Sequence, residues 1–291
     1  MTLIFTVVAG VLGLLIGSFL NVVAYRIPAH ISLMRASRCP HCDAAIKPWH
    51  NVPVLGWVVL GGKCASCKAP ISARYPVVEA TTGVAFALVV WWAIAVYEGV
   101  LGTTLPVYLA SPAWDGVVLA SDLWALALVI VALLYFAAIS IVLTLIDLDT
   151  HRLPNSIVLP SYVVAGALFT AAAWLSGDWA ALLTAAVGMA AMYALYFLLR
   201  LARPGGMGGG DVKLAGVIGI YLGWMGWGAL AVGAFAAFLL GGVFGIALML
   251  ARRAGRKTAI PFGPWMILGA WVGIFGGQAI GRWYTNLFIG A

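Results

Sequence analysis

Four cysteines form two C-x2-C pairs, Cys39 with Cys42 and Cys64 with Cys67, and 21 residues separate the two pairs. Thiolates spaced in this way can point at one ion, and two such pairs complete a tetrahedral zinc site. The separation is slightly longer than the usual spacing of about 15–20 residues. Four thiolates leave no open position for water, so we expect such a metal to fold its loop and to do no chemistry. Disulfides and reduced, unliganded cysteines are the alternatives.

Carboxylates mark two further segments. Asp147, Asp149 and His151 end one apolar run, and Asp211 directly follows the glycine-rich segment 205–210. Two carboxylates that share a proton can hydrolyse a peptide bond, because the ionised acid takes a proton from water while the protonated acid polarises the scissile carbonyl. Like charges a few ångströms apart cannot both ionise cheaply, which keeps the shared proton in place. We therefore predict that Asp147 and Asp211 form a catalytic pair.

The helix ends indicate which acid of the pair holds the proton. Asp147 is expected at the C-terminus of a helix, where the helix dipole disfavours negative charge, and Asp211 at an N-terminus, where the dipole favours it. Our hypothesis is that Asp147 is the more protonated partner, although the pair titrates as a unit.

Each acid also has a structural interpretation. Asp211 suits an N-cap, a role favoured after glycines, and Asp147 and Asp149 suit a solvated turn before Pro154, where the helix should end. The pattern Asp-x-Asp-x-His is also compatible with a metal site. If the helix continues through Asp149, the two acids of the first segment point about 200° apart, so only one faces a partner. The glycines either let an extended peptide approach the backbone or form a flexible loop.

The composition indicates that membrane helices position these residues. The chain has 291 residues, of which 64% are hydrophobic and 9% are charged, whereas soluble domains are about 25% charged. These values exclude a water-soluble globule, a disordered chain and a disulfide-stapled secreted miniprotein, and they indicate a polytopic membrane protein. In a membrane protein, the net charge of +7 first indicates how the chain is oriented in the bilayer. It is therefore no argument that the protein binds nucleic acid.

Long charge-free runs predict about eight transmembrane helices, because one crossing requires roughly 20 apolar residues. The run at 214–251 is too long for one crossing, and we expect a turn in its glycine-rich part, residues 223–228. The other runs are 2–25, 80–97, 123–146, 156–176, 179–199 and 259–281. The predicted fold class is therefore all-α: a polytopic membrane protein with one cytoplasmic zinc-binding loop. Its expected domains are the first helix (1–25), the cysteine loop (26–76) and a seven-helix core (77–291).

The basic residues predict the orientation. With the N-terminus outside, the loops at 26–76, 147–155, 200–213 and 252–258 face the cytoplasm and hold 15 of the 16 Lys and Arg residues. The opposite loops carry Glu98, Asp115, Asp122 and Asp178 and no Lys or Arg. This asymmetry places both candidate acids and the cysteine loop at the cytoplasmic face. The reducing cytoplasm disfavours disulfides in that loop.

Together these segments resemble the bacterial type IV prepilin peptidases, also called leader peptidase/N-methyltransferases. The shared motifs are GSFLNVVAYRIP (17–28), the two cysteine pairs with PWHNVP (48–53), GGKC (61–64) and RYPVVE (74–79), Ile146-Asp147 with Leu153-Pro154-Asn155, GMGGGDVKL (206–214) and IPFGP (260–264). Each motif alone is weak, but their order across almost the whole chain is specific.

The resemblance implies an intramembrane aspartyl protease of the G-x-G-D type, in which Asp147 and Asp211 match the catalytic aspartates. The four cysteines match the family's metal-binding tetrad, which supports zinc. The implied substrates are prepilins of type IV pili and pseudopilins of type II secretion, cleaved after a Gly at the cytoplasmic face of the bacterial inner membrane. The new N-terminal residue would then be methylated with S-adenosylmethionine. Asn155 stands where many relatives have Asp, a departure that leaves the acid pair untouched.

The methyltransferase activity is implied by the resemblance alone. The glycine-rich segment 205–210 has no strand before it, so it is not a Rossmann motif, and we name no residue for S-adenosylmethionine. The cysteine loop is the expected region by location. Glu79 either serves this activity or bonds a helix end, since helix N-termini attract Glu. The alternatives are a transporter, which should carry ionisable residues near the bilayer midplane, and a non-catalytic zinc-bearing membrane assembly factor.

Overall fold

The computed structural model describes residues 2–97, 120–203, 207–251 and 261–289. Within these ranges the long helices are α1 (Thr2–Arg26), α3 (Arg74–Tyr97), α4 (Ala120–Thr150), α5 (Asn155–Ser176), α6 (Trp179–Ala202), α7 (Gly209–Met225), α8 (Trp227–Leu250) and α9 (Gly263–Ile289). The loop between α1 and α3 contains a 3-10 turn, η1 (Pro48–His50), and the short helix α2 (Leu55–Val59). The described residues form two isolated β-bridges and no strand, so the predicted all-α class is confirmed.

The long helices follow the predicted charge-free runs but extend beyond them. α3 begins six residues before its run at 80–97, and α4 ends four residues after its run at 123–146. A charge-free run marks the apolar part of a helix, whereas the helix itself continues into polar residues that reach the interface. The predicted loop at 252–258, the glycines at 205 and 206, and the acids Glu98 and Asp115 lie outside the described residues.

Six of these helices are long and apolar enough to cross a membrane, which makes the chain a membrane protein. They are α1, α3, α4, α5, α6 and α8. α7 has 17 residues, so its length of about 26 Å is shorter than a hydrocarbon core of about 30 Å. The predicted number of eight spans stays a prediction for α7 and α9.

The structure divides into two compact units. The first unit contains α1, the cysteine loop and most of α3, together with residues 134–146 of α4. Glycines bring α1 and α3 into backbone contact: a Cβ atom on Gly13 would lie 2.6 Å from the carbonyl oxygen of Thr82, and one on Gly17 would lie 2.8 Å from Cα of Glu79. Small residues at such positions let membrane helices approach closely.

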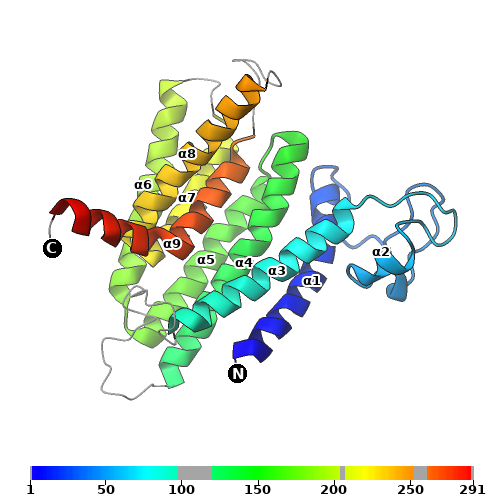
Figure 1. Ribbon diagram of the computed structural model, residues 1–291, viewed down its shortest axis with the longest axis horizontal. Helices are drawn as coiled ribbons and strands as arrows, with labels where there is room; N and C mark the ends of the chain where they lie inside the picture. The colour runs from blue at the N-terminus through cyan, green and yellow to red at the C-terminus, as the bar shows by residue number, and fades with distance from the viewer. Residues whose placement is uncertain (1, 98–119, 204–206, 252–260, 290–291) are drawn as a thin grey trace. The chain divides into compact units, whose positions relative to one another are not determined.

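The second unit contains α5 to α9, both terminal parts of α4 and the end of α3, and α7 lies at its centre (Figure 1). α7 contacts α5, α6, α8 and α9, and every residue from Leu214 to Met225 is buried. The predicted turn after this helix is confirmed, because α7 ends at Met225 and Gly226 adopts a φ of 99°, which favours glycine. The side-chain amide of Gln278 in α9 donates to the Met225 carbonyl at this turn.

Candidate active site and metal centre

The first predicted acid lies in the last turn of α4. The helix continues through Asp149 to Thr150, so Asp147 and Asp149 point to different sides of it. The side chain of Asp147 is 4% exposed, whereas Asp149 is exposed. Of these two acids, only Asp147 faces the protein interior, and it is not a solvated turn residue.

The second predicted acid lies in the first turn of α7. Asp211 is the third residue after the N-cap residue Gly208, and the N–H of Gly208 donates to Oδ2 of Asp211 over 3.0 Å. An acid at this position satisfies an N–H group of the helix start and interacts favourably with the helix dipole. Asp211 therefore does cap the helix, from the third helical position rather than from the N-cap position itself.

A backbone group outside the predicted acid pair donates to Asp147. The N–H of Gly263, the first residue of α9, donates to Oδ2 of Asp147 over 3.1 Å. A Cβ atom on Gly263 would lie 2.7 Å from the same oxygen, so glycine is required for this close approach. The available signal was the segment PFGP at 261–264, whose two prolines restrict the backbone on both sides of the glycine.

The connection between α4 and α5 brings these helix ends together. Cβ of Leu153 lies 2.9 Å from the place that a Cβ atom on Gly210 would occupy, and Cδ2 of Leu153 lies 3.5 Å from the corresponding place on Gly263. Leu153 therefore touches the residue before Asp211 and the residue that donates to Asp147. The charge of Asp147 contributes to the raised pKa of Asp211. The structure thus places the two predicted acids in one site, at the ends of α4, α7 and α9.

The electrostatics of the site favour a shared proton. Asp211 lies outside the six helices that are long and apolar enough to span a membrane. Burial and then the charge of Asp147 raise the pKa of Asp211 from its ordinary value of 3.8 to about 6, and the Gly208 N–H opposes this rise. The pair therefore keeps a proton at a pH where isolated carboxyls are ionised. Each acid accepts one backbone N–H, so these bonds do not decide which acid holds the proton.

Two hydrogen bonds fix α5 against the start of α7. The Lys213 amine donates to Oδ1 of Asn155 over 2.9 Å, and the Tyr162 hydroxyl donates to the Lys213 carbonyl over 2.6 Å. Asn155 therefore acts here as a neutral partner for a cation two residues from Asp211. Neither bond was evident from the sequence, because each joins residues that are far apart in the chain: Lys213 is 58 residues from Asn155 and 51 residues from Tyr162.

The described residues do not support a metal site at Asp-x-Asp-x-His. His151 adopts a φ of 52°, its N–H donates to the Asp147 carbonyl over 2.8 Å, and its Nδ1 lies 3.2 Å from the same oxygen. The histidine ring is thus directed at the backbone that ends α4. Among the described residues, the group whose side chains converge as metal ligands is the cysteine cluster.

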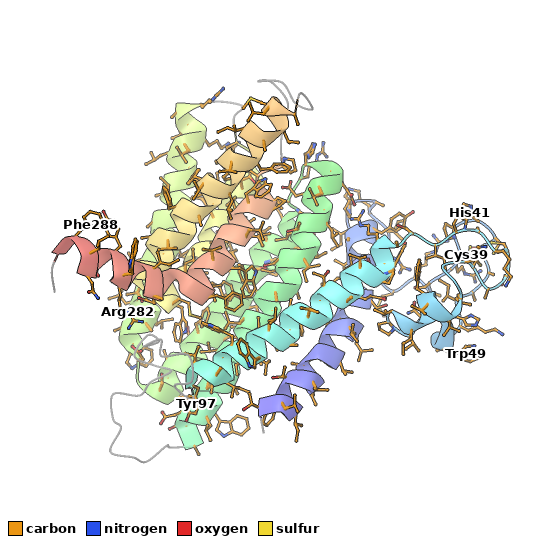
Figure 2. The ribbon with its side chains drawn as sticks, in the orientation of Figure 1. Cys39, His41, Trp49, Tyr97, Arg282 and Phe288 are labelled. Atoms are coloured by element: carbon orange, nitrogen blue, oxygen red, sulfur yellow. The ribbon has the colours of Figure 1, made fainter. Side chains whose placement is uncertain are left out.

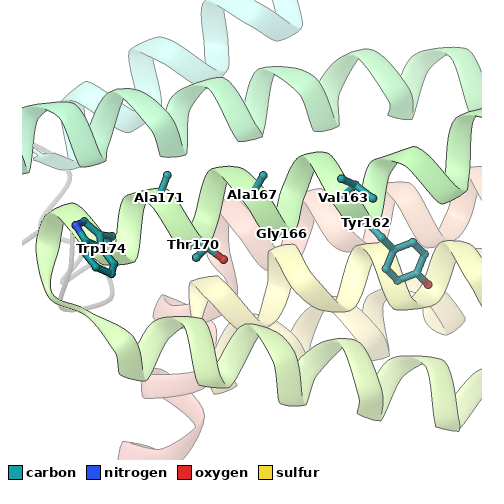
Figure 3. Close-up of a pocket in the computed structure, with 7 residues that line it drawn as sticks. All are labelled: Tyr162, Val163, Gly166, Ala167, Thr170, Ala171 and Trp174. Carbon is teal, nitrogen blue, oxygen red and sulfur yellow. The ribbon is translucent and has the colours of Figure 1, made fainter.

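A shallow apolar cavity of about 640 Å³ lies on the surface of α5 (Figure 3). Small side chains line its middle, with Tyr162 at one end and Trp174 at the other. Neither acid lines this cavity. It is therefore a feature of the lateral surface of α5 and not the place where the acids meet.

The four cysteines converge in the loop between α1 and α3, where Figure 2 labels Cys39. Their sulfur atoms all lie within 4.8 Å of one another, and the Sγ atoms of Cys39 and Cys67 are 3.9 Å apart. A tetrahedral zinc site with bonds of about 2.3 Å has sulfur–sulfur edges of about 3.8 Å. All four cysteines are unbridged by disulfides. The four residues therefore fit a single tetrahedral metal ion.

The two cysteine pairs belong to loops of the same construction. In each loop the N–H of the first cysteine donates to a carbonyl five residues later, Ala44 for Cys39 and Ala69 for Cys64. The residue after the second cysteine has a positive φ in both loops, 52° at Asp43 and 61° at Lys68. The sequence carries a matching signal, since RCPHCDAA at 38–45 aligns with KCASCKAP at 63–70.

The shifted pKa values of two thiols in this cluster are also compatible with a bound cation. The backbone N–H groups of Cys67 and Ser66 lower the pKa of Cys64 to about 6. The Ala44 N–H acts to lower the pKa of Cys42, but burial and the other three thiols outweigh it and raise that pKa to about 11. Four thiolates so close together repel one another, and a bound divalent cation removes that repulsion.

Glu79 bonds the end of a helix, one of its two predicted roles. The Glu79 side chain is buried, and its Oε2 accepts the N–H of Val54 over 2.7 Å. Val54 is the N-cap residue of α2 and has a φ of 61°. The bonded helix is therefore α2 in the cysteine loop and not α3, which carries Glu79 itself.

The fold and the site define a polytopic membrane protein with one buried carboxylate, Asp147, and one half-buried carboxylate, Asp211, at the ends of its helices. A family model described as Bacterial Peptidase A24 N-terminal domain matches residues 11–93, and one described as Type IV leader peptidase family matches residues 134–246. The chain belongs to the type IV leader peptidase family, in agreement with the resemblance seen in its motifs.

Curated relatives match over nearly the full length. A prepilin leader peptidase/N-methyltransferase of Stutzerimonas stutzeri is 31% identical and aligns with 98% of this chain and 95% of its own. Relatives of the same name from Neisseria gonorrhoeae and Pseudomonas aeruginosa are 33% and 30% identical, over 96% and 94% of this chain and 94% and 91% of theirs. No solved structure matches the chain.

Proposed function

We propose that this chain is a membrane aspartyl endopeptidase that cleaves prepilins and pseudopilins and then methylates the new N-terminus. The observation that carries the proposal is the meeting of Asp147 and Asp211 in one site, where each carboxylate accepts a backbone N–H. The family membership and the names of the full-length relatives support both activities. A transporter is less well supported, because the paired acids lie at helix ends.

Peptide hydrolysis at this site needs one proton on the pair. The ionised carboxylate takes a proton from the attacking water, and the protonated carboxyl donates a hydrogen bond to the scissile carbonyl oxygen. The N–H groups of Gly263 and Gly208 hold Oδ2 of Asp147 and of Asp211 in place, so both acids are oriented before the substrate arrives. A substrate helix held in the bilayer would lose less orientational entropy on binding, which lowers the barrier further.

The proposed cut follows a Gly residue at the cytoplasmic face of the bacterial inner membrane, with the N-terminus of the chain outside. The distribution of Lys and Arg supports this orientation. Arg152, Arg200 and Lys213 all lie near the helix ends that carry the acids, whereas Asp178 caps the opposite end of α6. The proposed organisation keeps residues 1–25 as the first helix, 26–76 as the metal loop and methyltransferase region, and 77–291 as the peptidase core.

Zinc is the proposed metal of the cysteine cluster, held by Cys39, Cys42, Cys64 and Cys67. With four thiolates the coordination shell is closed, so the metal supplies a constraint on the loop and no reactive site. S-adenosylmethionine is the proposed methyl donor. The described residues contain no strand, so they do not fit a Rossmann-type site for it.

Co-expression with a prepilin tests the peptidase proposal. We expect wild-type protein to shorten the prepilin, and Asp147→Asn and Asp211→Asn to lower the cleavage rate by at least about 10³-fold, because each removes an acid–base group. Asp149→Asn is the matched control, since Asp149 lies on the exposed side of the same helical turn. Mass spectrometry of the product N-terminus then reports one added methyl group. Appreciable cleavage by either pair variant would refute the assignment of the acids.

A further inference from the structure

Tyr196 is a buried phenol without a hydrogen-bond partner among the described residues. Its side chain is 0% exposed, and its hydroxyl oxygen is enclosed by protein atoms. Buried hydroxyl groups are normally hydrogen-bonded, so an unpaired one calls for a functional explanation. The ring is not simply a space-filling residue, because phenylalanine would fill the same space without burying a polar atom.

The packing of α6 against α7 explains where this hydroxyl lies. The two helices are antiparallel, and their contacts repeat at pairs of residues whose numbers sum to 407: Gly223 meets Thr184, and Gly219 meets Gly188. A Cβ atom on either Gly219 or Gly223 would lie 2.3 Å from a backbone oxygen of α6, so this register cannot slip. Continued by two turns, the same register places Tyr196 opposite Asp211.

Electrostatic and aromatic contacts agree with this register. The charge of Asp211 acts on the Tyr196 phenol. The ring of Tyr196 lies 5.4 Å from that of Phe238 in α8 and 6.2 Å from that of Phe262, measured between centroids. Phe262 directly precedes Gly263, the donor to Asp147. Tyr196 therefore has the acid Asp211 on its α7 side and apolar rings on its α8 and α9 sides.

We propose that Tyr196 is a third catalytic residue of the acid site, whose hydroxyl donates a hydrogen bond to the scissile carbonyl oxygen of the bound peptide. This inference rests on the proposed peptidase function. Its O–H makes no hydrogen bond to either acid, so this donor is unused in the substrate-free protein. Because the oxygen is enclosed, a peptide oxygen beside Asp211 reaches it only when substrate binding moves the surrounding side chains. As water adds to the carbonyl, negative charge grows on that oxygen, and the hydrogen bond strengthens most in the transition state. The donor accordingly favours turnover more than substrate binding.

Tyr196→Phe tests the proposal, because it removes the hydroxyl and keeps the ring that stacks on Phe238 and lies tilted against Phe262. We expect kcat for prepilin cleavage to fall roughly 10²-fold with little change in KM, as for the loss of one oxyanion donor. Tyr193→Phe is the matched control: Tyr193 is on the same helix, is 42% exposed and stacks on Phe197. We expect this control to cleave like the wild type.

A second measurement separates a catalytic role from a structural one. In the proposed function the acid pair serves cleavage alone, so Tyr196→Phe should methylate an already cleaved pilin at the wild-type rate. A variant that cleaves with wild-type kcat, or that loses cleavage and methylation equally, would overturn the inference. If the wild-type protein itself leaves prepilin intact, it is the proposed function that fails, and the comparison of variants distinguishes the two cases.

Discussion

Substituting alanine for Gly263 tests whether backbone approach to Asp147 matters for catalysis. The added Cβ atom would lie 2.7 Å from Oδ2 of Asp147, closer than carbon and oxygen atoms pack, so the carboxylate must move away and its 3.1 Å hydrogen bond must lengthen or break. A hydrogen bond to a charged group contributes about 1.5–3 kcal/mol. If that contribution is made in the transition state, its loss lowers kcat/KM by about 10- to 150-fold.

The assay is cleavage of purified prepilin by enzyme in nanodiscs, with methylation of pre-cleaved pilin as the measure of folded protein. Gly276→Ala is the matched control on the same helix, because a Cβ atom there meets only the flexible end of Ile280 at 3.5 Å. We expect Gly276→Ala to keep wild-type kcat/KM and Gly263→Ala to lose most of it while retaining methylation. Wild-type cleavage by Gly263→Ala would show that this hydrogen bond does not position the acid.

Two further predictions concern the titration of the acids and the metal loop. Cleavage requires the proton that the two acids share, and burial and the charge of Asp147 raise the pKa of Asp211 to about 6, so kcat/KM should fall as the pH rises through an apparent pKa near 6, where that proton is lost; an alkaline limb near the ordinary pKa of an isolated aspartate would contradict the electrostatic coupling. Cys64→Ser should abolish bound zinc, measured by mass spectrometry, and lower the Tm, because the three remaining thiolates leave the coordination shell of the metal incomplete. Ser66→Ala in the same loop is the control and should retain the metal. Full zinc content in Cys64→Ser would refute the four-thiolate site.

Local patterns in the sequence predicted much of this architecture. Charge-free runs indicated the long helices because a membrane helix must be apolar along its middle. The glycines around Gly226 indicated the turn after α7 because that residue needs a positive φ. The spacing of the cysteine pairs indicated the convergence of four sulfur atoms, since each C-x2-C loop directs its two thiolates the same way.

The remaining features depend on contacts between distant residues. Gly263 donates to Asp147 across 116 residues of chain, and although the PFGP segment marks this glycine as constrained, no local pattern indicates that its partner is Asp147. The position of Tyr196 opposite Asp211 follows from the register of α6 on α7, which is set by glycine contacts a full two turns away. Hydropathy treats Tyr196 as one more apolar residue of a membrane span, so its buried hydroxyl carries no signal in a single sequence.

The enclosure of α7 has a consequence for how the enzyme tolerates different lipids. Four neighbouring helices surround α7, so it is screened from acyl chains and has no need to match their length. A thinner or thicker bilayer acts first on the tilt of the outer helices. The helix that carries Asp211 is held by its protein neighbours. Protein packing, and not bilayer thickness, therefore sets the depth of that carboxylate relative to the membrane.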